Sequence, residues 1–122
     1  MDSQDQHMHT RGKGKAGEEA AIEHLLAKGY TVVSRNYQTR QGEIDCIARD
    51  PSGVLVFVEV KVSQSGRYGH PLFWVTRTKQ RRLAAMARRY RAQHNLTNVP
   101  CRFDVVAIDR GKVEHLVNAF LV

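Results

Sequence analysis

The sequence predicts a single α/β domain whose middle is a β-hairpin, and three observations lead to this prediction. Residues 43–49 and 54–61 have the alternation and the β-branched content of strands, and a turn signal separates them. Residues 16–28 and 76–94 carry apolar side chains at helical spacing. The remaining strands are expected at residues 30–37, 102–109 and 113–122. The chain therefore runs helix, strand, hairpin, helix, strand and a last strand.

Each predicted helix has an apolar stripe that a core would cover. In the first helix the stripe contains Ala21, Ile22 and Leu25, with Leu26 at its margin, and Gly29 ends the helix. The stripe of the second helix consists of Leu83, Met86, Ala87 and Tyr90. We expect both helices to pack on the sheet through these side chains.

The turn of the hairpin is the segment Asp50-Pro51-Ser52-Gly53. Pro51 suits the first central position of a type I turn, and Gly53 suits the left-handed residue that follows. This loop sets a register in which Asp45 lies directly opposite Glu59, on the same face of the hairpin. The second strand is apolar on both faces near its start, which indicates a central place in the sheet.

Asp45 and Glu59 form the candidate metal site together with Glu18 of the first helix. Like charges directly opposite each other destabilise a strand pair, and a bound divalent cation is the simplest reason for keeping them. Glu18 projects along the buried stripe, where an unpaired charge is costly. Taken singly, each acid could instead be a surface charge, a salt-bridge partner or a partner of the helix dipole. Their conjunction favours the metal site.

All three candidate ligands are carboxylates, and such donors predict Mg²⁺ or Mn²⁺. An ion of this kind can lower the pKa of a bound water and neutralise charge at a phosphodiester. Lys61 is the next residue along the same face as Glu59, where it could hold the attacking water or stabilise phosphate oxygens. Cys46 and Cys101 lack the spacing of a zinc site and are expected to be buried, reduced thiols, as in a cytoplasmic protein.

The charge of the chain points to an acidic partner, most often a nucleic acid. The net charge is +7, and the second helix holds seven of the 19 basic residues and none of the 12 acidic ones. A solvated helix usually mixes charges of both signs, so this one-sign helix favours phosphate contacts. The candidate nucleic-acid-binding residues are Arg35, Arg77, Lys79, Arg81, Arg82, Arg88 and Arg89.

The segments outside these elements contribute less. Residues 1–15 are predicted to be a flexible polar tail, and residues 16–122 the single domain. Residues 63–71 are expected to form a mobile, glycine-containing loop beside the site. No apolar run approaches the length of a membrane span and the polar start does not resemble a secretion signal, so we expect a cytoplasmic protein without a membrane partner.

The motif Gly42-Glu43-Ile44-Asp45, followed by Phe57-Val58-Glu59-Val60-Lys61, resembles the PD-(D/E)XK nuclease superfamily. More closely, the chain resembles the YraN-like family of uncharacterised bacterial proteins, which is similar to archaeal Holliday-junction resolvases. This resemblance implies a restriction-endonuclease-like αβββαβ core with a mixed central sheet flanked by helices. It also implies that Glu18, Asp45 and Glu59 are metal ligands and that Lys61 is the catalytic lysine.

Two functions compete for this set of residues. The first is a Mg²⁺- or Mn²⁺-dependent endonuclease that acts on DNA, with branched or junction DNA among its candidate substrates. The second is a nucleic-acid-binding module that keeps the fold without turnover, and a weaker third is a protein whose basic helix docks an acidic partner. Analogy with resolvases, which cut two strands symmetrically, adds the expectation of a homodimer.

Overall fold

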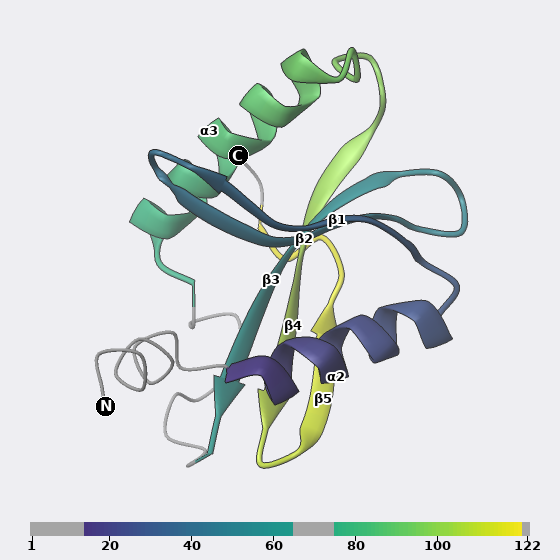
Figure 1. Ribbon diagram of the computed structural model, residues 1–122, viewed down its shortest axis with the longest axis vertical. Coiled ribbons are helices and arrows are strands. Elements are labelled where there is room, and N and C mark those ends of the chain that lie inside the picture. Colours follow the sequence, from purple (N-terminus) through teal and green to yellow (C-terminus); the bar gives the residue numbers. More distant parts are fainter. Residues whose placement is uncertain (1–13, 65–74, 121–122) are drawn as a thin grey trace.

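The computed structural model describes residues 14–64 and 75–120, which form a sheet with one helix against each face (Figure 1). Its elements are α2 (Gly14–Ala27), β1 (Thr31–Thr39), β2 (Gly42–Arg49), β3 (Leu55–Ser63), α3 (Arg77–Gln93), β4 (Cys101–Asp109) and β5 (Lys112–Leu116). The predicted order of helices and strands is confirmed. Neither described helix is long and apolar enough to cross a membrane.

The sheet has five strands in the order β1-β2-β3-β4-β5. Strands β3 and β4 are parallel, and every other neighbouring pair is antiparallel. The parallel pair is joined through α3, because parallel neighbours need a long crossover connection. The sheet is therefore mixed, as the resemblance implied, and β3 is its central strand.

The hairpin of β2 and β3 has the predicted turn and register. Gly53 has φ +93°, and its N–H donates to the Asp50 carbonyl at 2.9 Å, which closes the turn. The Asp50 carboxylate fixes the loop by accepting from the backbone N–H groups of Ser52 and Val54. The strands then pair in the expected register from Arg49–Leu55 to Cys46–Val58.

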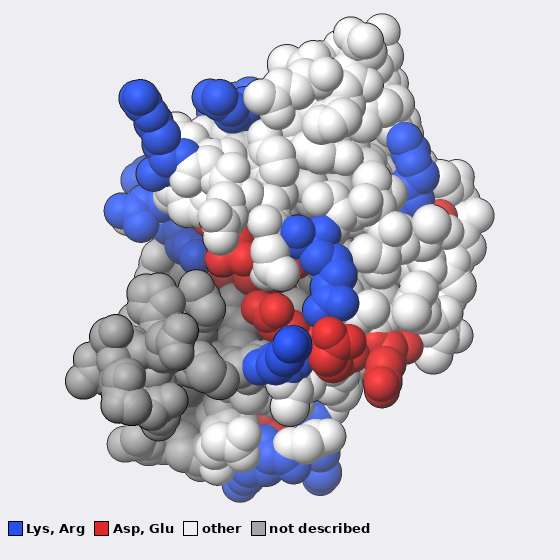
Figure 2. Space-filling model, viewed as in Figure 1, with Lys and Arg blue, Asp and Glu red and all other residues white. Residues whose placement is uncertain are grey.

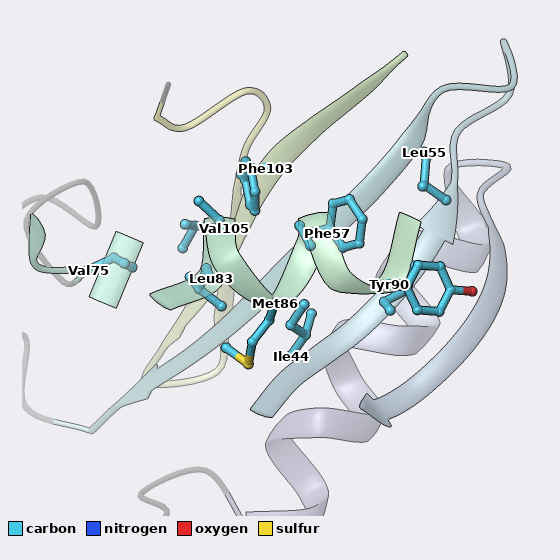
Figure 3. Close-up of a cluster of buried hydrophobic side chains, with 12 residues drawn as sticks. Ile44, Leu55, Phe57, Val75, Leu83, Met86, Tyr90, Phe103 and Val105 are labelled. Atoms are coloured by element: carbon cyan, nitrogen blue, oxygen red, sulfur yellow. The ribbon is translucent and has the colours of Figure 1, made fainter. Parts of the chain in front are cut away.

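The core on the α3 side forms where the apolar stripe of α3 meets β2, β3 and β4 (Figure 3). The whole predicted stripe is buried, and Tyr90 makes an edge contact with Phe57, with ring centroids 6.1 Å apart. Thr76 caps the helix by accepting from the Lys79 N–H at 3.1 Å. The predicted helix boundaries at 76 and 94 are the two cap residues.

The core on the α2 side contains the predicted stripe of the first helix. Ala21, Ile22 and Leu25 are buried against β3 and β4, whereas Leu26 is 53% exposed. Gly29 has φ +88°, a left-handed conformation that ends the helix as expected. Because α2 and α3 cover opposite faces, β3 is buried on both sides.

Most element boundaries differ from the prediction by one or two residues, and three of the differences bear on predicted segments. Helix α2 is described from Gly14, two residues before its predicted start, and residues 1–13 of the predicted tail lie outside the described part. The last strand ends at Leu116, not at 122, because Asn118 has φ +55° and turns the chain back towards β4. The predicted loop at 63–71 starts too early, since Ser63 is buried in β3, and residues 65–74 are not described.

Candidate active site

The candidate site lies where β2 and β3 separate. Their regular pairing ends at Cys46–Val58, one position short of the predicted Asp45–Glu59 pair. Beyond this point the Asp45 carboxylate accepts a 2.8 Å hydrogen bond from the backbone N–H of Val60. The side chain of Asp45 thus takes the place of a strand-pairing partner at Val60, the residue between Glu59 and Lys61.

Strand β2 changes its alternation at Asp45. Ile44 and Ile47 belong to the core on the α3 side, whereas Cys46 and Ala48 belong to the core on the α2 side. In a regular strand, residues two apart face the same side, so Ile44 and Cys46 would share one core. This irregularity lets Asp45 reach the backbone of β3 while its neighbours stay in the two cores. Asp45 itself is 7% exposed.

Glu59 is the most deeply buried acid of the site, at 2% exposure, and it lies between two lysines. Its Oε2 atom is 3.6 Å from Nζ of Lys61 and 3.6 Å from Nζ of Lys79. Lys61 comes from the same strand, whereas Lys79 reaches over from the first turn of α3. A buried carboxylate is costly unless opposite charge compensates it, and the two ammonium groups provide that charge.

Glu18 lies in the N-terminal half of α2 and is half-buried, while its neighbours Glu19 and Glu23 are exposed. Its inward direction agrees with the prediction. Within residues 14–64 and 75–120, no three side chains of His, Cys, Asp or Glu form a group that could hold a metal ion. The structure therefore joins Asp45, Glu59, Lys61 and Lys79 in one site and does not join Glu18 to them.

The donors at this site still suit a hard cation. Asp45 and Glu59 offer carboxylate oxygens, the ligand type that Mg²⁺ and Mn²⁺ prefer, and both side chains are buried. On the face shown in Figure 2, acidic side chains gather in the middle and basic ones border them. At the site itself, Lys61 and Lys79 would place positive charge where an anionic substrate would bind.

The predicted nucleic-acid-binding residues fall into three groups. The exposed ones on α3 are Arg77, Arg81, Arg82, Arg88 and Arg89. Lys79 belongs to the carboxylate site, and Arg35 forms a 2.9 Å ion pair with Glu19 on the surface. Arg91, a seventh basic residue of α3, is bound within the protein, donating to the carbonyls of Leu96, Thr97 and Val99.

A second buried polar cluster has Asp104 of β4 at its centre, and this cluster was not predicted from the sequence. Asp104 is fully buried, and its carboxylate contacts Arg102, His115 and the N–H of Asn118 at 2.8–3.0 Å. Burial opposes the charged form of Asp104, yet the hydrogen bonds from His115 and Arg102 hold its pKa below the usual range. We therefore assign Asp104 a structural role.

Further contacts extend this cluster to other elements. Arg102 also donates to Asp50 of the hairpin loop at 2.6 Å and to the Tyr30 hydroxyl at 2.7 Å. His115 in turn lies 3.1 Å from His24 of α2, measured between Nδ1 and Nε2. Burial and the nearby His115 lower the pKa of His24. The cluster thus ties α2, the hairpin loop, β4 and β5 together.

Both cysteines have free thiols, as expected. Cys46 is buried, and burial raises the pKa of its thiol to about 12, so the thiolate is scarce at neutral pH. Cys101 is only half-buried, which is more exposed than predicted, because it lies at the very start of β4.

Residues 17–108 match the model of the Uncharacterised protein family UPF0102. A UPF0102 protein of Symbiobacterium thermophilum is 53% identical over 102 residues, which cover 84% of this chain and 86% of that protein. A UPF0102 protein of Ralstonia pickettii is 46% identical over 115 residues, which cover 91% of each chain.

A third relative, a UPF0102 protein of Thermodesulfovibrio yellowstonii, is 44% identical over 107 residues, covering 88% of this chain and 94% of that protein. The matched region includes all four residues of the candidate site, Asp45, Glu59, Lys61 and Lys79. The family match and these similarities agree over most of the chain, so this protein is a member of the UPF0102 family.

Proposed function

We propose that this protein is a metal-dependent phosphodiester hydrolase, an endonuclease that acts on DNA. The observation that carries the proposal is the meeting of two buried carboxylates, Asp45 and Glu59, with two lysines where β2 and β3 separate. Carboxylates with adjacent lysines suit phosphoryl chemistry, in which one group binds a cation and the other meets phosphate. The motif resemblance supports the same assignment.

In this proposal Asp45 and Glu59 would hold Mg²⁺ or Mn²⁺, and Glu18 of α2, which the structure does not join to them, would be a third ligand. The bound ion supplies a water of lowered pKa and neutralises charge on the phosphodiester. The protein's side chains position the water and the phosphate. Lys61, whose side chain is 32% exposed, can reach a substrate at the surface and donate to the attacking water or to a phosphate oxygen. Lys79 adds a second positive charge beside it.

The substrate assignment rests on α3. Its five exposed arginines extend from the carboxylate site along one helix, and basic side chains gather over this part of the surface in Figure 2. Phosphate contacts of this kind position a nucleic acid without reading its sequence. We therefore propose that DNA lies along α3 with one phosphate at the carboxylates, and that branched DNA is among the substrates.

The test is cleavage of linear, flapped and four-way DNA with Mn²⁺, with Mg²⁺ and with EDTA. We expect metal-dependent products from the parent, and a loss of at least about a hundredfold in Asp45→Asn, Glu59→Gln and Lys61→Met. Glu23→Gln is the matched control, because it removes an exposed carboxylate from α2. Products that persist in EDTA, or equal rates in all variants, would contradict the proposal.

A second function, nucleic-acid binding without turnover, is favoured by one specific observation. Lys61 and Lys79 already compensate the charge of Glu59, so its burial can be explained by these two ion pairs, without a bound cation. If this function is right, DNA binds equally well in EDTA and in Mn²⁺, and no DNA is cleaved. The parent and Glu59→Gln would then differ in stability and not in affinity for DNA.

A further inference from the structure

A pocket of about 300 Å³ opens on the α3 side, away from the carboxylate site. It lies between the C-terminal half of α3, the start of β4 and the segment that follows β5. Cys101, on its wall, pairs with Leu55 at the other end of β3 from Glu59 and Lys61. Its volume is at the lower end of the range for small-molecule sites, which is about 300–1,000 Å³.

The inner wall of the pocket is apolar and partly aromatic. Phe103 and Phe120 lie face to face, with ring centroids 5.0 Å apart and planes inclined by 22°. On the opposite side α3 presents Ala84 and Ala87, whose short side chains leave the space open. A flat ring is the ligand shape that such a wall favours, because it can stack on an aromatic side chain.

The rim of the pocket is basic. Arg88 is exposed, and Arg91 is held in place by its hydrogen bonds to three carbonyls of the loop between α3 and β4. Arg91 therefore presents its charge at low entropic cost. An apolar slot with two guanidinium groups at its mouth is complementary to a planar ring that carries an anion.

The aromatic wall is fixed by contacts that the last described residues make with β4. The N–H of Asn118 donates to the buried Asp104 carboxylate at 2.9 Å, and the N–H of Ala119 donates to the Phe103 carbonyl at 2.7 Å. These bonds set the backbone immediately before Phe120. The Asp104 cluster thus has a second consequence, which is to hold the pocket open in one shape.

We propose that this pocket binds one nucleoside phosphate, with its base against Phe103 and Phe120 and its phosphate at Arg88 and Arg91. When the ligand is a nucleic-acid strand, the pocket would hold one nucleotide whose base is unstacked from the neighbouring bases. The inference rests on the proposed function only in taking nucleic acid as the partner. From Lys79 to Arg88 is about 13 Å along the helix, or roughly four nucleotides at the spacing of one strand of B-DNA.

The test measures binding in EDTA, so that it does not depend on cleavage or on metal. The probes are a fluorescent single-stranded oligothymidylate and a base-free oligomer with the same number of phosphates. We expect Phe120→Leu to weaken binding of the oligothymidylate at least about fivefold and to leave the base-free oligomer unchanged, since stacking needs a base. Arg88→Gln should weaken binding of the oligothymidylate more than Arg81→Gln, which removes an equal charge from α3 outside the pocket.

Alkylation of Cys101 by iodoacetamide gives a second measurement on the parent protein. We expect the oligothymidylate to slow it at least about threefold, whereas buried Cys46 should stay unmodified in both samples and so show that the fold is intact. Protection by thymidine monophosphate as well would identify a free nucleotide as a ligand, whereas protection by the oligomer alone would identify a nucleotide within a strand. If thermal melting shows that Phe120→Leu is unfolded, the binding of the oligothymidylate by Arg88→Gln and the protection of Cys101 still test the proposal.

Three results would overturn the proposal. One is an equal loss on both probes in Phe120→Leu, another is an equal effect of Arg88→Gln and Arg81→Gln, and the third is no protection of Cys101. If neither oligomer binds at all, nucleic acid is the wrong partner and the proposed function fails with it. If cleavage fails while Cys101 is protected, only the proposed enzymatic activity is lost.

Discussion

Lys79 and Glu59 are 20 positions apart in the chain, yet Nζ of the one lies 3.6 Å from Oε2 of the other. The contact joins the first turn of α3 to the central strand of the sheet, on the carboxylate oxygen that Lys61 also approaches. A cation entering the site would meet two positive charges already at Glu59. The lysines therefore set how tightly the site holds a metal ion.

Lys79→Gln should bind Mn²⁺ more tightly than the parent and cleave DNA more slowly. Removing a partly exposed charge near the carboxylates lowers the repulsion by about 0.5–1 kcal/mol, or two- to fivefold in affinity. Isothermal titration with Mn²⁺ measures this change. Arg82→Gln, which removes an exposed charge from the same helix, should leave affinity for the ion nearly unchanged. Weaker Mn²⁺ binding by Lys79→Gln would show that the lysine instead helps to shape the site.

Asp45→Asn should lose the stabilisation that Mn²⁺ gives the parent. A ligand that binds only the native state raises its stability, by about 2.7 kcal/mol at a hundred times its Kd. In EDTA the variant should melt close to the parent, because the amide oxygen can still accept from the Val60 N–H. Melting curves with and without Mn²⁺ test both statements. A clear loss of stability in EDTA, with no effect of metal on the parent, would make Asp45 a structural residue.

Asp104→Asn should destabilise the protein by about 2–3 kcal/mol at pH 7, because it removes the buried charge that Arg102 and His115 contact, although Arg102 keeps its ion pair with Asp50 of the hairpin loop. Urea unfolding measures the loss. Asp109→Asn is the matched control on the same strand, since among the described residues Asp109 forms its ion pair with the well-exposed Arg110, and this change should cost little. Similar values for the two variants would argue against a central role for Asp104.

The Asp104 carboxylate also makes the free energy of unfolding depend on pH, in a direction that follows from its lowered pKa. Its pKa in the folded protein is below the value of about 3.9 in an unfolded chain, so it stabilises the fold fully above that pH. The stabilisation is lost as the pH falls from about 4 through the lower, folded pKa. Unfolding free energies measured between pH 7 and pH 2 should therefore fall less steeply below pH 4 in Asp104→Asn than in the parent. Parallel curves would contradict the assigned direction of the shift.

Reversing two charges on α3, with Arg81→Glu and Arg89→Glu together, should weaken DNA binding and flatten its salt dependence. For each phosphate contact that is lost, the negative slope of log K against log salt becomes shallower by about 0.9. The matched control reverses Arg110 and Lys112, which are exposed at the turn between β4 and β5 and change the net charge equally. Equal effects of the two pairs would mean that overall charge, and not α3, attracts the DNA.

Much of the fold could be predicted because its signals are local. The turn at Asp50 and Gly53 fixes the hairpin register, and the spacing of Leu83, Met86 and Tyr90 fixes the buried face of α3. The end of regular pairing at Cys46 had no such signal, because it depends on how the two strands separate in the complete sheet. Asp45 was therefore placed opposite Glu59, whereas its carboxylate binds the backbone of Val60.

The contacts that complete the two polar clusters lie far apart in the chain. In the sequence Lys79 is one of several basic residues of α3, and none of its neighbours in the chain shows that it contacts Glu59. Asp104 offered a better clue, since an acid between Phe103 and Val105 in a strand-like run must find buried partners. Its partner His115 could not be identified, because the sequence does not show which side chains of neighbouring strands face each other.

The contact between His24 and His115 spans 91 positions of the chain. While the ribosome makes this protein, the α2 side of the sheet cannot be completed until β5 has emerged, because Asp104 would lack His115 and the Asn118 N–H. The hairpin and the helix α3, whose backbone hydrogen bonds are local, can form earlier. A nascent chain halted after β4 would thus hold a half-closed domain with a charged gap in one face, and this state is the one that chaperones and proteases would meet.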